Sequence, residues 1–229
     1  MEEKFCMKIE LTDTKPSIFE SKAGGMGYIP HDGDFPRDKD GNQLRLLAQI
    51  DCSQVELEEF PEKGLLQFWI LNDDITGLGE DQTEQDGFRV IYYPETDSTV
   101  TEEEIKNKFV KNQYDDDEYN AFPVFGEYGM IFRKSTDKYI DNKENYDEYY
   151  DECIGHKIGG YPYFTQGDPR ECSDELKKYD FLLFQLDSDY TGGNDRVMWG
   201  DSGIGNFFIK TENLKNCDFS DVLYNWDCC

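Results

Sequence analysis

The sequence predicts an α+β protein: a β-rich single domain with an internal duplication, in which a mostly antiparallel sheet carries a few short helices. Three observations favour this fold class. Short apolar runs bounded by turn residues recur along the chain, as is typical of buried strands. One order of motifs occurs twice. Aromatic residues make up 15% of the 229 residues, so the chain has large side chains for one substantial core.

The two copies share the order Lys-x-Gly-Gly, a tyrosine three residues after the second glycine, an apolar run that ends in Gln-apolar-Asp, and a second apolar run. Their separation grows only from 159 − 24 = 135 to 209 − 70 = 139 residues, so the order is kept while the loops lengthen. The matched segments are 22–25 with 157–160, 46–51 with 182–187, and 66–70 with 205–209.

Two copies of one unit favour one fused domain over 1–229 rather than two separate ones. The segment between the copies is strongly acidic, and we interpret it as an insertion that joins them. The expected parts are repeat one at about 22–93, the acidic insertion at about 94–156, and repeat two at about 157–229.

The first part of the chain predicts four strands and one helix. Thr101 followed by three glutamates has the pattern of a capping box, and Ile105, Phe109 and Val110 recur at helical spacing, which predicts a helix over 101–111. Turn residues and Pro94 bound the apolar runs. The expected strands are 4–11, 44–51, 64–71 and 88–93.

The second part continues the pattern with a tyrosine-rich surface helix over 144–153 and a short helix over 173–179 that Ser173 caps. The C-terminal segment 218–229 contains Trp226 and enough apolar residues to be held against the protein. The expected strands are 128–134, 181–187, 196–199 and 205–210.

Composition limits the possible partners. The net charge is −27, from 50 acidic and 23 basic residues, so we expect no binding to nucleic acid or to anionic membranes. A basic protein is the natural partner for such a charge, although acidity that serves only solubility is the more ordinary explanation. No long apolar segment or secretory signal is visible, and seven cysteines form no regular framework. These features predict a cytoplasmic protein with reduced thiols.

No catalytic residue can be assigned from motifs. The segment from Gly200 to Gly203 resembles the nucleophile segment of chymotrypsin-like proteases, but neither His31 nor His156 has the sequence context of a triad histidine. Ile204 stands where the hydrolase elbow needs glycine. A tight turn between strands is the better interpretation of Asp201 and Ser202.

Two segments resemble metal sites in part, but we expect neither a metal nor a cofactor. Asp187, Asp189 and Asp195 resemble part of a calcium loop, but Met198 occupies the position of the final bidentate acid. Cysteines and a histidine at 153, 156, 228 and 229 lack the paired spacing of a zinc site. Whether the loop 187–195 holds a cation stays open.

The Gln-apolar-Asp motifs are the main candidates for a ligand site. Residues two apart on a strand point to the same face, so the amide and carboxylate of each copy should face the same way. If a pseudo-twofold axis relates the copies, these side chains line one central cleft; alternatively they bond to the Gly-Gly turns and hold each copy together. The candidate ligand-binding residues are Gln49, Asp51, Gln185, Asp187, Trp199, Asp201 and Ser202.

Several segments resemble a known family. They are Gly-Gly-Tyr-Pro-Tyr-Phe-Thr-Gln at 159–166 with Asp-Pro-Arg at 168–170, Met-Trp-Gly-Asp-Ser-Gly-Ile-Gly-Asn-Phe-Phe-Ile at 198–209, Asn-Trp-Asp-Cys-Cys at 225–229, and the strands at 46–51, 64–70 and 88–92. Over nearly the whole chain these residues resemble the YwqG-like family of bacterial proteins, a domain of unknown function. The resemblance implies a β-rich α+β fold with an internal duplication and brings no activity. Gly27 departs from it, since the second copy has Pro162 there.

The sequence therefore predicts an acidic cytoplasmic protein that binds a basic partner. One form of this hypothesis is an immunity-type protein that neutralises a cationic toxin such as a nuclease, by imitating its polyanionic substrate. The alternative is a small-ligand-binding protein or hydrolase that uses the Gln/Asp-lined cleft, with or without a metal. A third hypothesis is a scaffold whose acidic segment 94–156 binds the partner. The sequence does not determine the oligomeric state.

Overall fold

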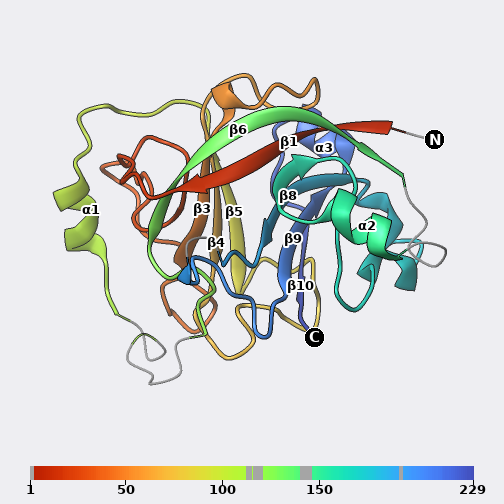
Figure 1. Ribbon diagram of the computed structural model, residues 1–229. Helices are drawn as coiled ribbons and strands as arrows, with labels where there is room; N and C mark the ends of the chain where they lie inside the picture. Colours follow the sequence, from red (N-terminus) through yellow and green to blue (C-terminus); the bar gives the residue numbers. More distant parts are fainter. Residues whose placement is uncertain (1–2, 112–114, 116–120, 140–145, 191–192) are drawn as a thin grey trace.

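Ten antiparallel strands form one sheet in the computed structural model, which describes residues 3–111, 115, 121–139, 146–190 and 193–229 (Figure 1). Three short α-helices lie outside the sheet (Figure 1). The prediction of a β-rich protein with a mostly antiparallel sheet and few helices is confirmed. Among the described residues, no helix is long and apolar enough to cross a membrane.

The strands and helices follow each other along the chain with loops of very different lengths. The strands are β1 (Glu3–Thr12), β2 (Lys22–Gly24), β3 (Arg45–Asp51), β4 (Leu65–Ile70), β5 (Phe88–Tyr93), β6 (Glu127–Lys138), β7 (His156–Gly159), β8 (Phe181–Asp187), β9 (Ile204–Ile209) and β10 (Val222–Asp227). The helices are α1 (Glu102–Lys108), α2 (Tyr146–Cys153) and α3 (Thr211–Lys215), and short 3₁₀ turns lie at 52–54, 169–172 and 176–178.

The order of strands is symmetric about the centre of the sheet. It runs β10-β9-β8-β7-β1-β6-β2-β3-β4-β5, so the long strands β1 and β6 form the central pair. Outward from this pair, β2 to β5 and β7 to β10 each follow chain order. We call β6 with β2–β5 the first half of the molecule and β1 with β7–β10 the second half.

The two halves also agree in register. Lys22 pairs with Gln49 in the first half, and Lys157 pairs with Gln185 in the second. Both β3 and β8 have a bulge one position after their second residue, where the pairing skips Leu47 in one strand and Leu183 in the other. A bulge bends its strand and increases the local twist, so both halves curve at the same place.

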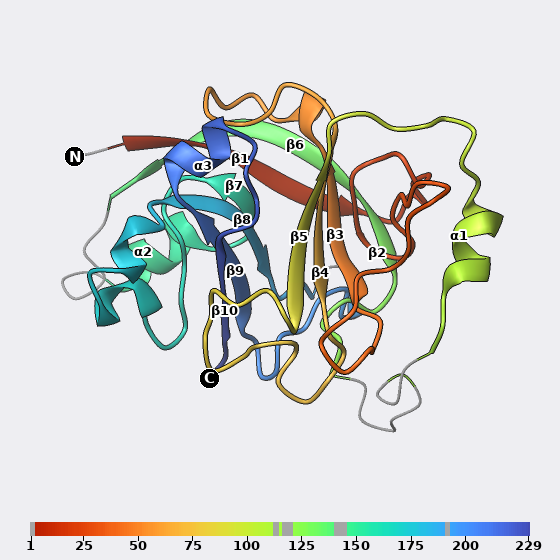
Figure 2. The same cartoon turned by 180° about the vertical axis from the view of Figure 1, so that it is seen from behind.

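The sheet bends back on itself, so that β3–β5 and β8–β10 face each other below the arch made by β1 and β6 (Figures 1 and 2). Apolar side chains from both halves fill the space between them and form one core. The rings of Phe68 and Phe184 stack at 4.7 Å between centroids, and those of Phe88 and Phe207 lie 6.1 Å apart. Packing between the halves therefore supplies much of the buried apolar area that stabilises the fold.

The loop before β5 reaches across to the outer strand of the second half. Tyr224 on β10 donates its hydroxyl hydrogen to the carbonyl of Thr76 at 2.9 Å, and its own N–H donates to the carbonyl of Gln82 at 2.9 Å. The Gln82 amide donates to Asn225 at 2.7 Å. These bonds cover part of β10, which would otherwise expose an unpaired edge.

Most predicted strands are confirmed, with one error and three omissions: β2, β7 and β10, whose segment was expected only to be held against the protein. The expected strand 196–199 is wrong, because Val197 makes only isolated bridges to Asp189 and Val124. The short strands β2 and β7 were read only as turns, since each ends in glycines at positive φ. The strand expected at 128–134 runs over 127–138, because β6 is paired on both sides.

Two of the three α-helices, α1 and α2, match their sequence signals with different ends, whereas α3 was not predicted and the helix expected over 173–179 is a 3₁₀ turn at 176–178. Thr101 caps α1, as its hydroxyl accepts the Glu104 N–H at 3.2 Å, but the helix ends at Lys108 rather than at 111. The buried Gln43 amide accepts the Val110 N–H at 2.7 Å, which holds the chain away from the helix path. Most of the acidic run 114–120 lies outside the described residues. The segment 94–156 is more than a connecting insertion, because it supplies β6 to the middle of the sheet.

Candidate functional site

Gln49 and Gln185 are fully buried and make the same three hydrogen bonds in the two halves. In the first half the Gln49 side chain accepts the Tyr28 N–H at 2.9 Å and donates to the carbonyls of Ile18 and Glu20, each at 2.9 Å. Each bond has its counterpart in the second half, so one half suffices to describe the arrangement.

In the second half Gln185 accepts the Tyr163 N–H at 2.9 Å and donates to the carbonyls of Cys153 and Gly155, at 2.9 and 2.7 Å. Each amide therefore fastens the segment before its short strand to the tyrosine after its glycine pair. These contacts agree with the second interpretation of the Gln-apolar-Asp motif, in which the motif holds each copy together.

The two glutamines do not meet in a common cleft. Ala48 and Ile50, the neighbours of Gln49, lie in the central core with Phe184 and Leu186, the neighbours of Gln185. Because side chains alternate along a strand, both amides point to the opposite faces, away from the space between the halves. These side chains therefore do not converge on one central cleft, as the first interpretation expected.

The Lys-x-Gly-Gly motif builds a cradle for a carboxylate. Lys22 is buried and lies 2.7 Å from the Glu127 carboxylate, while the fully buried Lys157 lies 2.6 Å from Asp137. Gly160 has a φ of +75°, and a Cβ there would lie 2.2 Å from the Asp137 carboxylate. Only glycine allows both this backbone conformation and this close approach.

A thiol completes the buried cluster of the second half. The Sγ of Cys6 donates to Asp137 at 3.3 Å, and burial raises the pKa of this thiol to about 12. The neutral thiol is therefore the form present at neutral pH, and it acts as a hydrogen-bond donor rather than as a nucleophile.

One groove of about 870 Å³ gathers residues from distant parts of the chain. It lies in the second half, between the end of β1, the segment that enters β7 and the segment that follows β8. We call it the acidic groove and define it by Tyr150, His156, Asp187, Asp189, Tyr190 and Arg196. Two of the seven residues predicted for the ligand site, Asp187 and Ser202, line it.

His156 is held in a defined tautomer at the wall of the groove. Its side chain is 8% exposed, and its Nδ1 accepts the N–H of Asp187 at 3.0 Å. An Nδ1 that accepts a hydrogen bond carries no proton, so the ring hydrogen of the neutral imidazole is on Nε2. That Nε2 lies 3.8 Å from the Asp189 carboxylate, beyond hydrogen-bond distance.

The two aspartates of the groove have different surroundings. Asp187 accepts the N–H groups of Gly155 at 2.7 Å and Ser188 at 2.8 Å, and burial raises the pKa of its carboxyl above the ordinary value. Asp189 is 13% exposed and lies between His156 and Arg196, whose Nη1 is 3.9 Å from it. Asp187 mainly holds the backbone in place, whereas Asp189 presents charge to the groove.

Ser202 and its neighbours do not form a hydrolase site in this arrangement. The Ser202 hydroxyl bonds to the hydroxyl of Tyr190, and its backbone has a φ of +59°, as in a tight turn. Nδ1 of His156 accepts the Asp187 N–H and its Nε2 lies 3.8 Å from Asp189, and no hydrogen bond among the described residues joins this ring to Ser202. Trp199 is 1% exposed and lies in the core, with its ring 6.1 Å from that of Trp226. The exposed Asp201 accepts the Cys229 N–H through its backbone carbonyl.

The candidate metal ligands named from the sequence do not form a cluster among the described residues. Within the described part of the chain, no three His, Cys, Asp or Glu side chains are placed to hold a metal ion together. Of the calcium-like loop, Thr191 and Gly192 lie outside the described residues.

The corresponding position in the first half is closed. Ser21 stands where the second half has His156, and its hydroxyl accepts the Asp51 N–H at 2.8 Å, as Nδ1 of His156 does for Asp187. The Ser21 hydroxyl in turn donates to the Gln54 side chain at 2.6 Å. The Asp51 carboxylate caps the following 3₁₀ turn by accepting the Ser53 N–H at 3.0 Å. Each of these polar groups is thus bonded within the first half.

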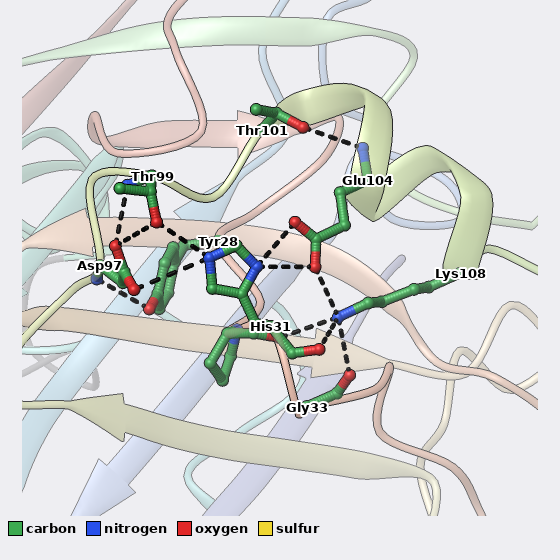
Figure 3. A network of polar contacts seen from close by, with 9 residues as sticks. Tyr28, His31, Gly33, Asp97, Thr99, Thr101, Glu104 and Lys108 are labelled. Atoms are coloured by element: carbon green, nitrogen blue, oxygen red, sulfur yellow. Dashed lines mark hydrogen bonds and ion pairs between the residues drawn. The ribbon is translucent and has the colours of Figure 1, made fainter.

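The other histidine belongs to a surface network that fastens α1 to the first half (Figure 3). His31 lies between Glu104, 2.9 Å from Nδ1, and Thr99, 3.0 Å from Nε2. The hydrogen bond from His31 holds the pKa of the Glu104 carboxyl below its ordinary value. Lys108 donates to three carbonyls of the neighbouring loop, those of Pro30, His31 and Gly33.

Sequence patterns missed half of the acidic groove. Tyr190 and Arg196 carry no local signal of a site, and residues 9–13 are predicted only as the end of a strand and the turn that follows it. His156 and Asp189 were singled out, but as metal ligands in separate motifs. Only the pairing of β1 with β7 and of β7 with β8 brings these segments together.

Comparison with known proteins adds a family and no activity. No curated protein matches the chain. A model of a protein family matches residues 21–228, which include all but one of the ten strands. The chain therefore belongs to the family described as a domain of unknown function, DUF1963.

Proposed function

We propose that this protein binds a basic protein partner and that the acidic groove is its contact site. The observation that carries the proposal is the charge of the groove: its described lining has four acidic side chains, those of Glu10, Asp13, Asp187 and Asp189, and one arginine, Arg196. The net charge of −27 extends the same sign over the whole protein. Such a field attracts a cationic partner from a distance and speeds its capture at low ionic strength.

Aromatic side chains support the same proposal. Tyr150 and Tyr163 line the groove with their rings 5.3 Å apart at 85°, and Tyr190 is 49% exposed beside them. The faces of such rings attract ammonium and guanidinium groups, an interaction of about 0.5–2 kcal/mol. Tyrosine also gives large contact area at low entropic cost in protein interfaces.

A direct experiment measures the affinity of the purified protein for a cationic ribonuclease at several salt concentrations, with a near-neutral protein of similar size as the control. We expect binding of the cationic protein that weakens steeply with salt, because the Debye length falls to about 10 Å at 0.1 M. Loss of ribonuclease activity in the complex would support the immunity-type form of the proposal. Absence of binding at low salt, or binding indifferent to salt, contradicts it.

The second candidate is a small-ligand-binding protein or hydrolase. The Gln/Asp cleft between the copies is not its site, since Gln49 and Gln185 are bonded within separate halves. Asp187 and His156, which share the acidic groove, are the residues that favour this candidate. Soaking crystals with a panel of small metabolites tests it, and no density in the groove would weigh against it.

We also propose that the two halves arose by duplication of one unit and that the chain is related to the YwqG-like proteins. The symmetric strand order, the shared bulge and the equivalent glutamine bonds support an origin from one unit copied twice. The residues at 159–166 and 198–209 support the YwqG-like relationship within the family.

A further inference from the structure

We infer that the acidic groove binds an arginine side chain together with the extended peptide segment that carries it, supplied by the basic partner. The inference rests on the proposed function and names the chemical group that the groove recognises. Two observations beyond the acidity carry it: the chain's own arginine already occupies one end of the groove, and two polar groups on its wall lack hydrogen-bond partners.

Arg196 shows what this environment accepts. Its guanidinium donates to the Leu11 carbonyl at 2.9 Å and to Asp13 at 2.8 Å, lies 3.9 Å from Asp189, and sits over the Tyr128 ring at 5.6 Å. Carboxylates, a carbonyl and an aromatic face are the partners that a planar guanidinium prefers. The groove lining also offers the Asp189 carboxylate and the aromatic rings of Tyr150 and Tyr190.

The wall also offers groups that suit a peptide backbone. The Nε2–H of His156 makes no hydrogen bond among the described residues, because the Asp189 carboxylate lies 3.8 Å away, although the side chain is only 8% exposed. The Thr165 hydroxyl is buried and has no hydrogen-bond partner there either. The His156 donor on this wall can bond to a carbonyl of an extended peptide, and leaving such a group unpaired is costly.

The first half contains a built-in comparison. At the equivalent position Ser21, Gln54 and Asp51 are bonded to one another and to the backbone, and no histidine is present. We therefore expect one arginine-binding groove per chain, in the second half. This makes Asp51→Asn a matched control for Asp189→Asn, because both substitutions remove one negative charge.

The test uses isothermal titration calorimetry with the full chain and the peptide Ac-Gly-Gly-Arg-Gly-Gly-NH2. Its citrulline analogue has the same shape without the charge, and spermidine has charge without peptide groups. We expect the citrulline peptide to bind about 10-fold more weakly or worse, since hydrogen bonds from a charged guanidinium to carboxylates are stronger than those from a neutral group. Spermidine should bind more weakly than the arginine peptide.

The protein variants locate the site. Asp189→Asn should weaken the arginine peptide about 10-fold, and Tyr150→Ala should weaken it about 3-fold through the lost cation–π contact. Asp51→Asn and Tyr139→Ala, which alter an aspartate and an exposed tyrosine outside the groove, should change the affinity less than about 2-fold. Tyr150→Ala keeps the test valid if Asp189→Asn unfolds, which circular dichroism would reveal.

Three outcomes overturn the inference and leave the proposed function intact: equal weakening by Asp51→Asn and Asp189→Asn, spermidine binding as tightly as the peptide, or a cationic ribonuclease that binds while the peptide does not. Failure of every basic protein to bind would instead overturn the proposed function itself.

Discussion

The same structural position is closed in the first half of the molecule and open in the second. After β3, Ser21, Asp51 and Gln54 bond to one another, whereas after β8 His156, Asp187 and Asp189 line a groove of about 870 Å³. The scaffold contacts beneath are alike, since Gln49 and Gln185 make the same bonds. The difference teaches that one framework holds both halves, while a few residues at the strand ends decide which half can bind a ligand.

The halves also differ in how their buried lysines are neutralised. Glu127, the partner of Lys22, is 21% exposed, while Asp137 and Lys157 are both fully buried. Asp137 lies on β6, which belongs to the first half, so this pair joins the two halves across β1. The cost of breaking each pair should therefore differ.

The largest expected effect is on Lys157. Lys157→Met leaves Asp137 charged and buried, which should lower the free energy of unfolding by about 3–5 kcal/mol. Lys22→Met should cost less, about 1–3 kcal/mol, because water can reach Glu127. Urea denaturation of both variants measures the difference, with the exposed Lys177→Met as the control. The double variant Lys157→Met with Asp137→Leu should recover stability; equal losses at Lys22 and Lys157 would contradict the comparison.

Equal effects are expected for the two glutamines. Gln49→Ala and Gln185→Ala each leave a tyrosine N–H and two carbonyls without the side chain that bonds them, so each should cost about 2–4 kcal/mol; Gln49→Ala also removes an acceptor of the Gln67 amide, which still donates to the Tyr28 carbonyl. Thermal unfolding of the two variants, beside the exposed Gln166→Ala, checks this. If only one of the two is destabilising, the glutamines are not equivalent supports.

A smaller effect tests the surface network that the first half has around α1. Thr101→Ala removes the cap of α1 and should lower the free energy of unfolding by about 1 kcal/mol. Thr99→Ala, which removes a partner of His31 but leaves the cap, serves as the comparison. Hydrogen exchange of residues 102–108 should increase more in the Thr101 variant; unchanged exchange would show that packing alone holds the helix.

The smallest effect is a pH dependence that arises from Asp187 in the second half. Burial raises the folded-state pKa of Asp187 above 3.8, so the folded protein binds this proton more tightly than the unfolded chain. Its contribution to stability is full below pH 3.8 and is lost as pH rises through the folded pKa. Stability of the wild type should therefore fall with rising pH relative to Asp187→Asn. Urea denaturation of both proteins across this pH range measures the difference; parallel curves for wild type and Asp187→Asn would contradict the effect of burial.

Local sequence patterns predict much of the fold. The runs that became β3, β5 and β8 were placed to within a residue, and Thr101 was recognised as the cap of a helix. These features depend on neighbours in the chain, so they are visible in sequence. The segment 196–199 was misread because an apolar pair beside a turn looks like a strand, although its hydrogen bonds go to single residues.

The sequence by itself determined the β-rich class, the repeated order of motifs and the acidic charge, since composition and short-range spacing suffice for these. The tertiary structure decided which way Gln49 and Gln185 point, because β3 and β8 are buried on both faces and alternation then gives no direction. It also placed β6 beside β1 and assembled the acidic groove from β1, β7 and the segment after β8. Such contacts depend on strand pairing between residues far apart in the chain, which no local pattern specifies.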